Sequence, residues 1–397
     1  MPDTLAFVVP WYGPAIPGGA EAECRATARA LRARGLAVEI LTTCARDHGS
    51  PWIDHHPDGV TEEDGFVVRR FKVRPRDPDR YARLQWRLEL GGALTSFEEE
   101  DFVRESIHSN DLYAYLAAER HRYWYAFIPY CFGTTWEGAL IAPERSVLIP
   151  CLHEEPFAAL KWTRRVLRAV RAACFHVPAE RDLAESLAGP DADRFHLVGE
   201  GVDPPPPGDP QGFRARHRIF EPFLLYVGRK APEKNTPLLV EYFARYKLTH
   251  PASRLKLVLI GPGGVRIPGR LSADVLDLGF VPPQEKADAY AGALALCQPS
   301  LLESFSLVMM EAWLAGTPAL VHGRCRVTRD HCLASDGGLY FDDYFEFVEA
   351  VEALAGDAAL RERMAAAGRA YVRANYTWDR VTDNYLAVFR RLGAGLG

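Results

Sequence analysis

Residues 299–320 have the sequence PSLLESFSLVMMEAWLAGTPAL, in which a helix signal is followed directly by a strand signal. Residues 305–315 are apolar and consist mostly of good helix formers; Gly316 then favours a helix end, and Pro318 prevents continuation. The apolar segment 318–323 that follows is typical of a strand. A helix that leads into a strand is the repeating element of a parallel α/β sheet.

Two glutamates lie eight residues apart in this stretch. If the whole interval is helical, Glu303 and Glu311 are about 12 Å apart and point to broadly the same side. Their carboxylates can accept hydrogen bonds from sugar hydroxyls, and the free N–H groups at the helix start between them favour an anion. Apolar residues surround Glu311, so its carboxylate needs a partner, either a ligand or a buried arginine.

Two cations precede these glutamates in the segment YVGRKAPEKNTPLL at 226–239. Arg229 and Lys234 stand just after an apolar, strand-like run, and two such cations can neutralise a diphosphate. Cations for a diphosphate and carboxylates for sugar hydroxyls together indicate a site for a nucleotide sugar. The alternative is that all four side chains are ordinary solvated charges.

The alternation of strand and helix signals extends over both halves of the chain. The expected strands lie at 5–12, 38–43, 66–73, 126–131, 146–151, 174–177 and 195–198, and then at 223–228, 256–261, 275–281, 293–300, 318–323 and 338–341. A charged helical insertion is expected at about 78–123, and four prolines at 204–207 indicate a domain boundary.

These signals predict two Rossmann-like parallel-sheet domains, at 1–201 and 202–377, with ligands bound in a cleft between their carboxyl strand edges. The last segment, 378–397, is an amphipathic helix that is expected to pack back on the N-terminal domain.

The length, net charge and cysteine content of the chain exclude several classes of protein. At 397 residues the chain is long enough for two cores, and a net charge of −5 argues against a dedicated nucleic-acid binder. No apolar run reaches the length of a membrane span, and Asp3 occupies the place of a positive signal-peptide start. Eight scattered cysteines without metal-like spacing suggest reduced core residues and a cytoplasmic protein.

Four ordered motifs carry a family resemblance: GRKAPEKN (228–235), LIGPGG (259–264), GFVPPQEKADAYAGA (279–293) and the stretch at 299–320. With them, residues 220–380 resemble the large GT4-type family of retaining glycosyltransferases, which have the GT-B fold. The resemblance implies a transferase that moves a hexose-type sugar from a nucleotide-diphosphate sugar to a glycan, glycolipid or small-molecule acceptor, as in polysaccharide biosynthesis.

The resemblance assigns roles to the charged residues of the second half. Arg229 and Lys234 would hold the diphosphate and stabilise the charge of the departing nucleotide. Glu311 would bind the ribose hydroxyls, and Glu303 the hydroxyls of the transferred sugar.

Further donor contacts are implied at two backbone segments. The backbone of Phe305, Ser306 and Leu307 would meet the phosphates or the sugar at the helix start. Phe280 and Val281 would lie against the base, largely through their backbone.

The first half resembles the family more loosely, through its Gly18-Gly19 loop, the segment CLHE at 151–154 and the segment GVD at 201–203. There the resemblance implies that Gly19 approaches the phosphates and that His153, after the strand at 146–151, approaches the transferred sugar. The implied catalytic residues are thus His153, Arg229, Lys234 and Glu303.

The expected chemistry needs no cofactor and no metal. No Asp-x-Asp motif follows a strand as a metal–diphosphate site would require, and fixed cations can stabilise the leaving group instead. No carboxylate is obviously placed as a covalent nucleophile. Attack of the acceptor on the face from which the nucleotide departs, with the leaving phosphate as base, is therefore our hypothesis for retention.

Two other functions stay open at this stage, an epimerase of nucleotide sugars on the same architecture and a non-catalytic subunit that binds them. A further alternative concerns location. The cationic side chains of 161–171 fall close to one helical face, which is usually solvated but could also contact an anionic membrane peripherally at its inner face.

Overall fold

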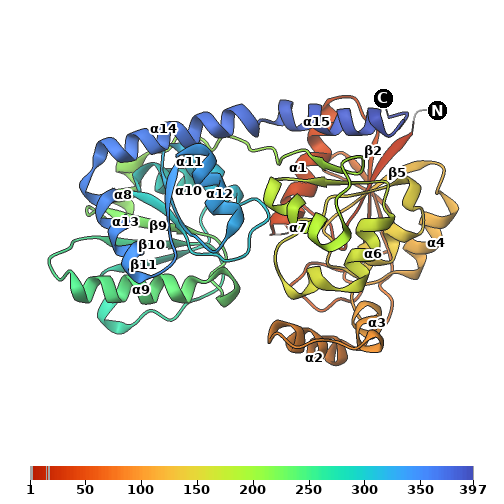
Figure 1. Ribbon diagram of the computed structural model, residues 1–397, viewed down its shortest axis with the longest axis horizontal. Coiled ribbons are helices and arrows are strands. Elements are labelled where there is room, and N and C mark those ends of the chain that lie inside the picture. The colour runs from red at the N-terminus through yellow and green to blue at the C-terminus, as the bar shows by residue number, and fades with distance from the viewer. Residues whose placement is uncertain (1–2, 15, 17, 397) are drawn as a thin grey trace. The chain divides into compact units, whose positions relative to one another are not determined.

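The computed structural model describes residues 3–14, 16 and 18–396, which form two compact units. Unit 1 comprises Met1–Gly201 and Trp378–Gly397, and unit 2 comprises Val202–Thr377. The chain therefore leaves unit 1 once, builds the whole of unit 2, and returns to unit 1 for its last helix (Figure 1).

Unit 1 is built on an eight-stranded sheet in the order β3-β4-β2-β1-β5-β6-β7-β8. All neighbouring strands are parallel except β3, which runs antiparallel to β4. The strands are β1 (Thr4–Val8), β2 (Val38–Thr43), β3 (Gly59–Glu63), β4 (Phe66–Phe71), β5 (Tyr123–Phe127), β6 (Ser146–Leu148), β7 (Ala172–Phe175) and β8 (Phe195–Leu197).

Helices cover both faces of this sheet. They are α1 (Gly19–Ala33), α2 (Pro78–Glu89), α3 (Ser96–Arg104), α4 (Asn110–Ala118), α5 (Gly133–Trp136), α6 (Lys161–Ala169), α7 (Pro178–Ala188) and α15 (Trp378–Arg391). Alternate residues of β1 enter different cores: Leu5 and Phe7 pack toward α1 and α15, and Ala6 and Val8 pack toward the other helices. Both faces of the sheet are therefore buried, as parallel strands require. Figure 1 shows α15 beside α1.

The charged insertion predicted at 78–123 forms three separate helices, α2, α3 and α4. Each begins at a side chain that caps its free N–H groups: Asp77 for α2, Thr95 for α3 and Ser109 for α4. Thr95 and Glu98 form a reciprocal capping box. The Tyr81 ring of α2 stacks on Phe102 of α3, and both are buried, so this pair joins the two helices.

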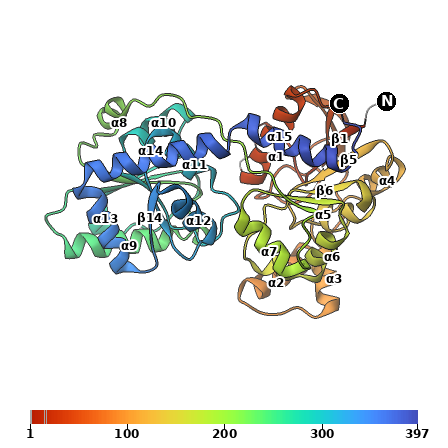
Figure 2. The ribbon, with the colours of Figure 1, turned by 45° about the horizontal axis from the view of Figure 1, so that its top comes forward.

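Unit 2 has a six-stranded, fully parallel sheet in the order β11-β10-β9-β12-β13-β14. Its strands are β9 (Phe223–Val227), β10 (Lys256–Ile260), β11 (Val275–Gly279), β12 (Ala295–Gln298), β13 (Ala319–His322) and β14 (Gly338–Phe341). Its helices are α8 (Pro210–His217), α9 (Thr236–Thr249), α10 (Pro283–Gly292), α11 (Leu307–Ala315), α12 (Arg326–Ser335), α13 (Tyr344–Gly356) and α14 (Ala358–Asn375). Helices α9 and α13 cover one face, and α10 and α11 lie on the other (Figures 1 and 2).

These two sheets confirm the predicted α/β architecture, but several local predictions were wrong. Strand β1 ends at Val8 rather than at 12, and β5 spans 123–127 rather than 126–131. Strand β6 ends at Leu148, three residues earlier than expected, and β11 ends at Gly279, whose φ is +64°. Strand β3 was missed, because its sequence GVTEE is polar and lies at an exposed sheet edge. The Asp64-Gly65 turn that joins it to β4 has positive φ at both residues, which is the usual hairpin signal.

In the part of the chain that the structure describes, no helix is both long and apolar enough to span a membrane. All eight cysteines are free thiols, and six of them are buried.

Candidate functional site

The order of strands in unit 2 identifies the edge at which a ligand should bind. Neighbouring strands β9 and β12 are where the strand order reverses, so the connections that follow them lead to opposite sides of the sheet. In open α/β sheets the crevice at the carboxyl ends of such a pair is the usual ligand site. Here the loop after β9 is 228–235, and the loop after β12 is 299–306. They are the two segments that the sequence motifs singled out.

The two loops meet through a lysine and a glutamate. The Nζ of Lys234 donates to Oε1 of Glu303 at 2.8 Å, and Gln298 at the end of β12 donates to the same oxygen at 3.2 Å. Asn235 holds the loops together by donating to the Pro299 carbonyl at 3.0 Å. Only 11% of the Glu303 side chain is exposed, against 29% for Lys234. A small polar ligand therefore meets an ordered pair of opposite charges.

The remaining cations of the first loop differ in their surroundings. Arg229 is about half exposed and pairs with the equally exposed Glu233 at 3.0 Å, so its guanidinium is held only weakly. Lys230 is buried, and its Nζ contacts the Gly261 carbonyl at 2.7 Å and the Asp277 carboxylate. Lys230 thus ties together the ends of β9, β10 and β11, whereas Arg229 remains available to a ligand.

The start of α11 offers backbone donors beside this pair. Ser306 precedes the helix with φ at +76°, and its side chain makes no capping hydrogen bond to the described residues. Its buried Oγ also has no hydrogen-bond partner among them. Phe305 is buried, and its ring lies edge-to-face on that of Tyr376, with the ring centroids 4.8 Å apart and the planes at 79°, which anchors the chain where it enters the helix. A helix start without a side-chain cap is a ready site for an anion.

Glu311 lies in the middle of α11 and is held by α10. Lys286 donates to both of its carboxylate oxygens at 2.8 Å, and Tyr290 donates to Oε2 at 2.9 Å. The sequence predicted that Glu311 binds either a ligand or a buried arginine. The arginine alternative was wrong, because its protein partners are a lysine and a tyrosine. Burial and the nearby Glu311 carboxylate raise the pKa of Tyr290, so its hydroxyl stays a donor. The Glu311 side chain is 23% exposed, which leaves one side open to a ligand.

The helical spacing assumed for the two glutamates was also wrong. The helix begins at Leu307 rather than at 305, because Ser306 has left-handed backbone angles that an α-helix excludes. Glu303 therefore lies in the loop, and the estimate of about 12 Å from helical rise does not apply to the pair.

Phe280 and Val281 directly follow β11, and one side chain is exposed to solvent while the other is buried. Phe280 is 81% exposed and Val281 only 8%. The Gly279 amide donates to Asp277 at 3.0 Å, and its positive φ turns the chain there. The aromatic ring therefore stands in solvent while Val281 anchors the turn.

Gly19 and His153 belong to unit 1. Gly19 is the first residue of α1, and a methyl group added to its Cα would meet no atom within 4 Å. His153 lies in the loop after β6, with Nδ1 3.3 Å from Oε1 of Glu155, and 29% of its side chain is exposed. Tyr130 donates to the same Glu155 oxygen, which positions the carboxylate beside the imidazole.

Four polar residues at the unit 2 edge escaped the sequence reading: Asn235, Lys286, Tyr290 and Gln298. Lys286 and Tyr290 are four residues apart in a predicted helix, so they share one face, and that spacing was the available signal. Asn235 takes a left-handed conformation with φ at +56°, which asparagine tolerates well. Gln298 stands at the end of an apolar strand, and nothing local distinguishes it from a core residue.

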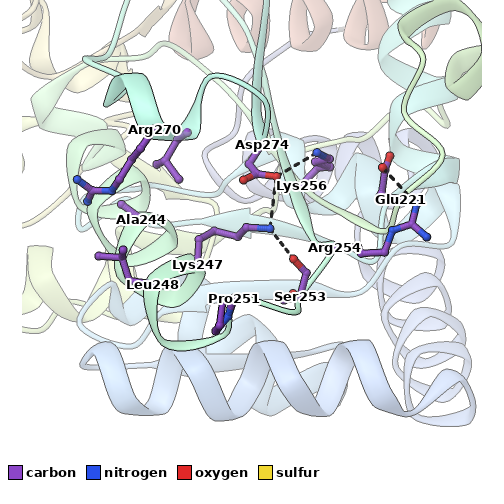
Figure 3. A pocket seen from close by; sticks show the side chains of 11 residues that line it. Glu221, Ala244, Lys247, Leu248, Pro251, Ser253, Arg254, Lys256, Arg270 and Asp274 are labelled. Atoms are coloured by element: carbon purple, nitrogen blue, oxygen red, sulfur yellow. Dashed lines mark hydrogen bonds and ion pairs between the residues drawn. The ribbon is translucent and has the colours of Figure 1, made fainter.

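A pocket of about 470 Å³ lies elsewhere on unit 2, and Figure 3 shows its lining. Lys256 at the start of β10 contributes to it, so the pocket is at the amino ends of the strands, opposite the edge described above. Both of its acidic residues are already paired: Asp274 lies 3.3 Å from Lys247 and 3.0 Å from Lys256, and Glu221 lies 3.4 Å from Arg254. We therefore place the functional site at the carboxyl edge.

Comparison with known families gives two matches that together span most of the chain. Residues 18–201 match the model described as glycosyl transferase 4-like domain, and residues 213–371 match the model described as glycosyl transferases group 1. The chain is similar to D-inositol 3-phosphate glycosyltransferases: 26% identical to that of Jonesia denitrificans over 92% of this chain and 89% of the relative. It is 33% identical to that of Acidothermus cellulolyticus, in a match that spans about half of each chain, 51% and 49%.

Solved structures share the fold. Sucrose-phosphate synthase from Thermosynechococcus elongatus superimposes with a TM-score of 0.74 at 18% identity, over 99% of both chains. An Anabaena protein solved in complex with UDP and glucose gives a TM-score of 0.68 at 15% identity, over 98% of this chain and 99% of that one. With both family models, the named relatives and the two-sheet fold in agreement, this chain belongs to the GT4, group 1 family of glycosyltransferases.

Proposed function

We propose that the protein transfers a hexose-type sugar from a nucleoside-diphosphate sugar to a hydroxyl group of a small phosphorylated acceptor, with retention of configuration and without a metal. The observation that carries the donor half is the Lys234–Glu303 pair beside the uncapped start of α11 at the strand-order reversal of unit 2. The acceptor half is supported by the names of the relatives, which act on inositol phosphate.

In this proposal the diphosphate lies against the start of α11. The backbone N–H groups of 305–307 donate to it, and Lys234 and Arg229 supply positive charge. Lys234 would exchange part of its contact with Glu303 for a phosphate oxygen, and both contacts are charge-assisted hydrogen bonds. Gly19 of unit 1 is proposed to approach the same phosphates through its backbone, which has room on its Cβ side.

The carboxylates then bind hydroxyl groups. Glu311, held in place by Lys286 and Tyr290, accepts from the ribose hydroxyls. Glu303 accepts from hydroxyls of the transferred sugar, because the Lys234 and Gln298 contacts fix its orientation. His153 is proposed to contact the transferred sugar from unit 1, with Glu155 holding its ring.

The base is proposed to lie against the turn formed by Phe280 and Val281, after β11. UDP is our first choice of nucleotide, because it is the nucleotide bound in the structurally similar Anabaena protein.

The chemical step needs charge stabilisation rather than a protein nucleophile. The bond between the sugar C1 and the diphosphate oxygen breaks, and its electron pair stays on the diphosphate, where Lys234, Arg229 and the helix start offset it. The acceptor hydroxyl forms the new bond to C1 on the same face, and its proton passes to the departing phosphate. No metal is required in this scheme, because cationic side chains and helix-end donors hold the charge that a metal would otherwise hold.

A product assay with a lysine variant tests the proposal. Wild-type protein incubated with UDP-glucose and inositol 1- or 3-phosphate should release UDP and a phosphorylated glycoside. Lys234→Met should lower kcat by about 10²- to 10³-fold while its thermal midpoint stays close to that of wild type. Lys256→Met, which removes a lysine at the opposite end of the sheet, is the matched control for loss of a partly buried ammonium group.

Three results would overturn parts of the proposal. Conversion of the nucleotide sugar to its epimer without an acceptor would establish the epimerase alternative. Tight UDP binding with no turnover on any acceptor would establish the non-catalytic subunit. Near-normal activity of Lys234→Met would remove Lys234 from the diphosphate site.

Membrane contact is a separate proposal that rests on α6. Lys161, Arg164, Arg165 and Arg168 are exposed and line one shallow depression of about 400 Å³. An anionic surface is the partner for such a row of cations. Salt-sensitive co-sedimentation with phosphatidylglycerol vesicles, and its loss in Arg164→Ala/Arg168→Ala, would support this location; equal sedimentation with neutral vesicles would contradict it.

A further inference from the structure

Unit 1 contains a second cluster of ionisable side chains, all of them buried. Glu23 lies in α1, His176 directly after β7, Glu180 in α7, and Glu200 just before the chain leaves the unit. Their exposures are 4%, 3%, 1% and 6%, so the cluster is closed to solvent. Ligand atoms of Glu23, His176 and Glu200 all lie within 4.8 Å of one another.

The imidazole of His176 is held from both sides. Its Nε2 contacts Oε1 of Glu23, and its Nδ1 lies 3.1 Å from Oε2 of Glu180. Glu180 is itself fixed by the backbone, because it accepts from the amides of Leu152 and His176 at 2.7 Å each. A histidine with one ring nitrogen oriented by a well-anchored carboxylate and the other turned to a group of acidic oxygens has the usual arrangement of a metal ligand.

Charge in the cluster favours a cation. Counted alone, these three carboxylates and one imidazole have a formal sum of −2 even if the histidine is protonated, and a nearby cation lowers the cost of burying carboxylates. One divalent ion bound to a neutral His176 changes the sum for these four groups to −1. The thiol of Cys151 lies at the edge of the cluster, 3.1 Å from Oε2 of Glu23, and adds a soft donor.

Independent support comes from Tyr385 in α15. Its side chain is 1% exposed, and its hydroxyl has no hydrogen-bond partner among the described residues. Tyr385 belongs to the same core cluster as Cys151, whose thiol lies 3.1 Å from Glu23, so its buried ring is next to the acidic cluster. Burial, first, and the nearby acidic groups raise the pKa of its phenol. A buried hydroxyl that lies near carboxylates and yet bonds to none of them is expected where an ion or its water lies between.

We propose that Glu23, His176 and Glu200 bind one divalent transition-metal ion inside unit 1, with Glu180 as the positioning residue for His176 and with Cys151 and Tyr385 beside the ion. One imidazole, two carboxylates and a neighbouring thiol are donors that suit Zn²⁺. Tetrahedral bonds to Zn²⁺ place ligand atoms about 3.3 Å apart, so binding requires side-chain shifts of only about an ångström or two.

The role of this ion would be structural, because a closed site leaves no open position for substrate. Its ligands come from α1, from the β7–α7 connection and from the segment ending at Gly201, and Tyr385 comes from the returning helix α15. The ion would therefore join parts of unit 1 that are distant in sequence. It is separate from the donor site of unit 2, and this proposal does not depend on the proposed glycosyl transfer. The alternative is a cluster held by protons alone, with His176 charged between Glu23 and Glu180.

Metal analysis of the full chain tests the existence of the site. Protein purified without chelator should contain close to one equivalent of Zn²⁺ or another first-row divalent ion per chain. Prolonged treatment with EDTA should lower the thermal midpoint of unfolding by about 5 °C or more, and added Zn²⁺ should restore it. A metal content below a tenth of an equivalent together with an unchanged midpoint on adding Zn²⁺ would overturn the proposal and favour the proton-only cluster.

Variants test the location. Glu200→Gln and His176→Asn should each lower the metal content at least tenfold. Glu99→Gln is the matched control. Glu99 lies in α3 and is also buried in unit 1, at 6%, but it accepts a hydrogen bond from the Trp162 amide and is not part of the cluster. The Glu99→Gln variant should therefore keep the metal. Full metal content in folded Glu200→Gln and His176→Asn would place the ion elsewhere and overturn the assignment.

A measurement on the wild-type protein tests whether the chain holds a four-coordinate metal site, even if those variants fail to fold. Co²⁺ added to EDTA-treated protein should give the intense visible absorption of a four-coordinate ion with protein ligands. Only the pale spectrum of six-coordinate, hydrated Co²⁺ would mean adventitious surface binding and would overturn the proposal.

Discussion

The ammonium group of Lys286 donates to both carboxylate oxygens of Glu311 at 2.8 Å, across the gap between α10 and α11. With Tyr290 as a further donor, the carboxylate is held in one orientation before any ligand arrives. Pre-organised acceptors bind hydroxyl groups at less entropic cost than mobile ones.

Glu311→Ala should therefore weaken binding of UDP by about 10- to 100-fold, since two hydrogen bonds to a charged acceptor are lost. Isothermal titration with UDP measures this change. Tyr290→Phe keeps the carboxylate and removes only one of its supports, so its affinity should fall much less. Equal losses of affinity in both variants would indicate that Glu311 acts through the packing of α10 on α11 and not through the ligand.

Gly19→Ala tests the approach of phosphates to the start of α1. Because an added methyl group meets open space, the fold should tolerate it and the unfolding free energy should change by less than about 0.5 kcal/mol. Activity should nevertheless fall at least tenfold if phosphate oxygens occupy that space. Gly356→Ala, at a second position with open space, is the control and should leave turnover unchanged. Normal turnover in Gly19→Ala would remove this residue from the donor site.

Phe280→Ala tests whether the exposed ring contacts the base. Aromatic contact with a base contributes about 1–2 kcal/mol, so the Kd for UDP should rise about 5- to 30-fold. Phe97, which has the same 81% exposure but lies in α3, supplies the matched control Phe97→Ala. Stability should change little in either variant. An unchanged Kd in Phe280→Ala would show that this turn meets the base through its backbone alone.

Glu63 and Arg70 predict a pH-dependent contribution to stability. Arg70 is 5% exposed and bonds to Oε2 of Glu63 and to the Tyr12 carbonyl, both at 2.9 Å. The Arg70 contact holds the pKa of Glu63 below its ordinary value of 4.5. A lowered carboxyl pKa stabilises the fold above about pH 4.5, and this contribution is lost as the pH falls through the lowered value.

Glu63→Gln should therefore lower the unfolding free energy by about 1–3 kcal/mol at neutral pH. The difference from wild type should shrink as the pH falls below about 4.5, when wild-type Glu63 also loses its charge. Urea unfolding at a series of pH values measures both curves. A difference that stays constant down to the acid limit would contradict the ion pair as its source.

The sequence predicted the structure correctly where a local residue pattern is compatible with only one conformation. Apolar runs bounded by Gly and Pro predicted nearly every strand, and Gly316 does end α11, with φ at +92°. It failed where a neighbour from elsewhere in the chain decides the conformation. Ser306 is one such case: it has left-handed angles directly after Phe305, whose ring packs on Tyr376, 71 residues further along the chain.

The candidate site shows the same division. Lys234 and Glu303 could be selected from motifs, and the structure brings them within 2.8 Å of each other. The sequence did not predict that Lys234 and Glu303 form an ion pair, or that Lys286 binds Glu311. These partners are 69 and 25 residues apart, and they come into contact only because of the order of the strands in the folded sheet. The buried cluster around His176 was missed entirely, since its members are spread over three separate segments, in α1, at the β7–α7 connection and at Glu200.

The discontinuity of unit 1 has a consequence for how the gene could be rearranged. The Asp3 amide donates to the Gly395 carbonyl at 3.0 Å, so residues near the two ends of this sequence are neighbours. Gly201 and Trp378 also touch, since a methyl group on Gly201 would lie 2.2 Å from the indole. A circular permutant that opens at Val202 and joins the old ends by a short linker would convert the interrupted layout into a plain tandem, in which each unit is encoded without interruption and can be cloned, labelled or exchanged as a cassette.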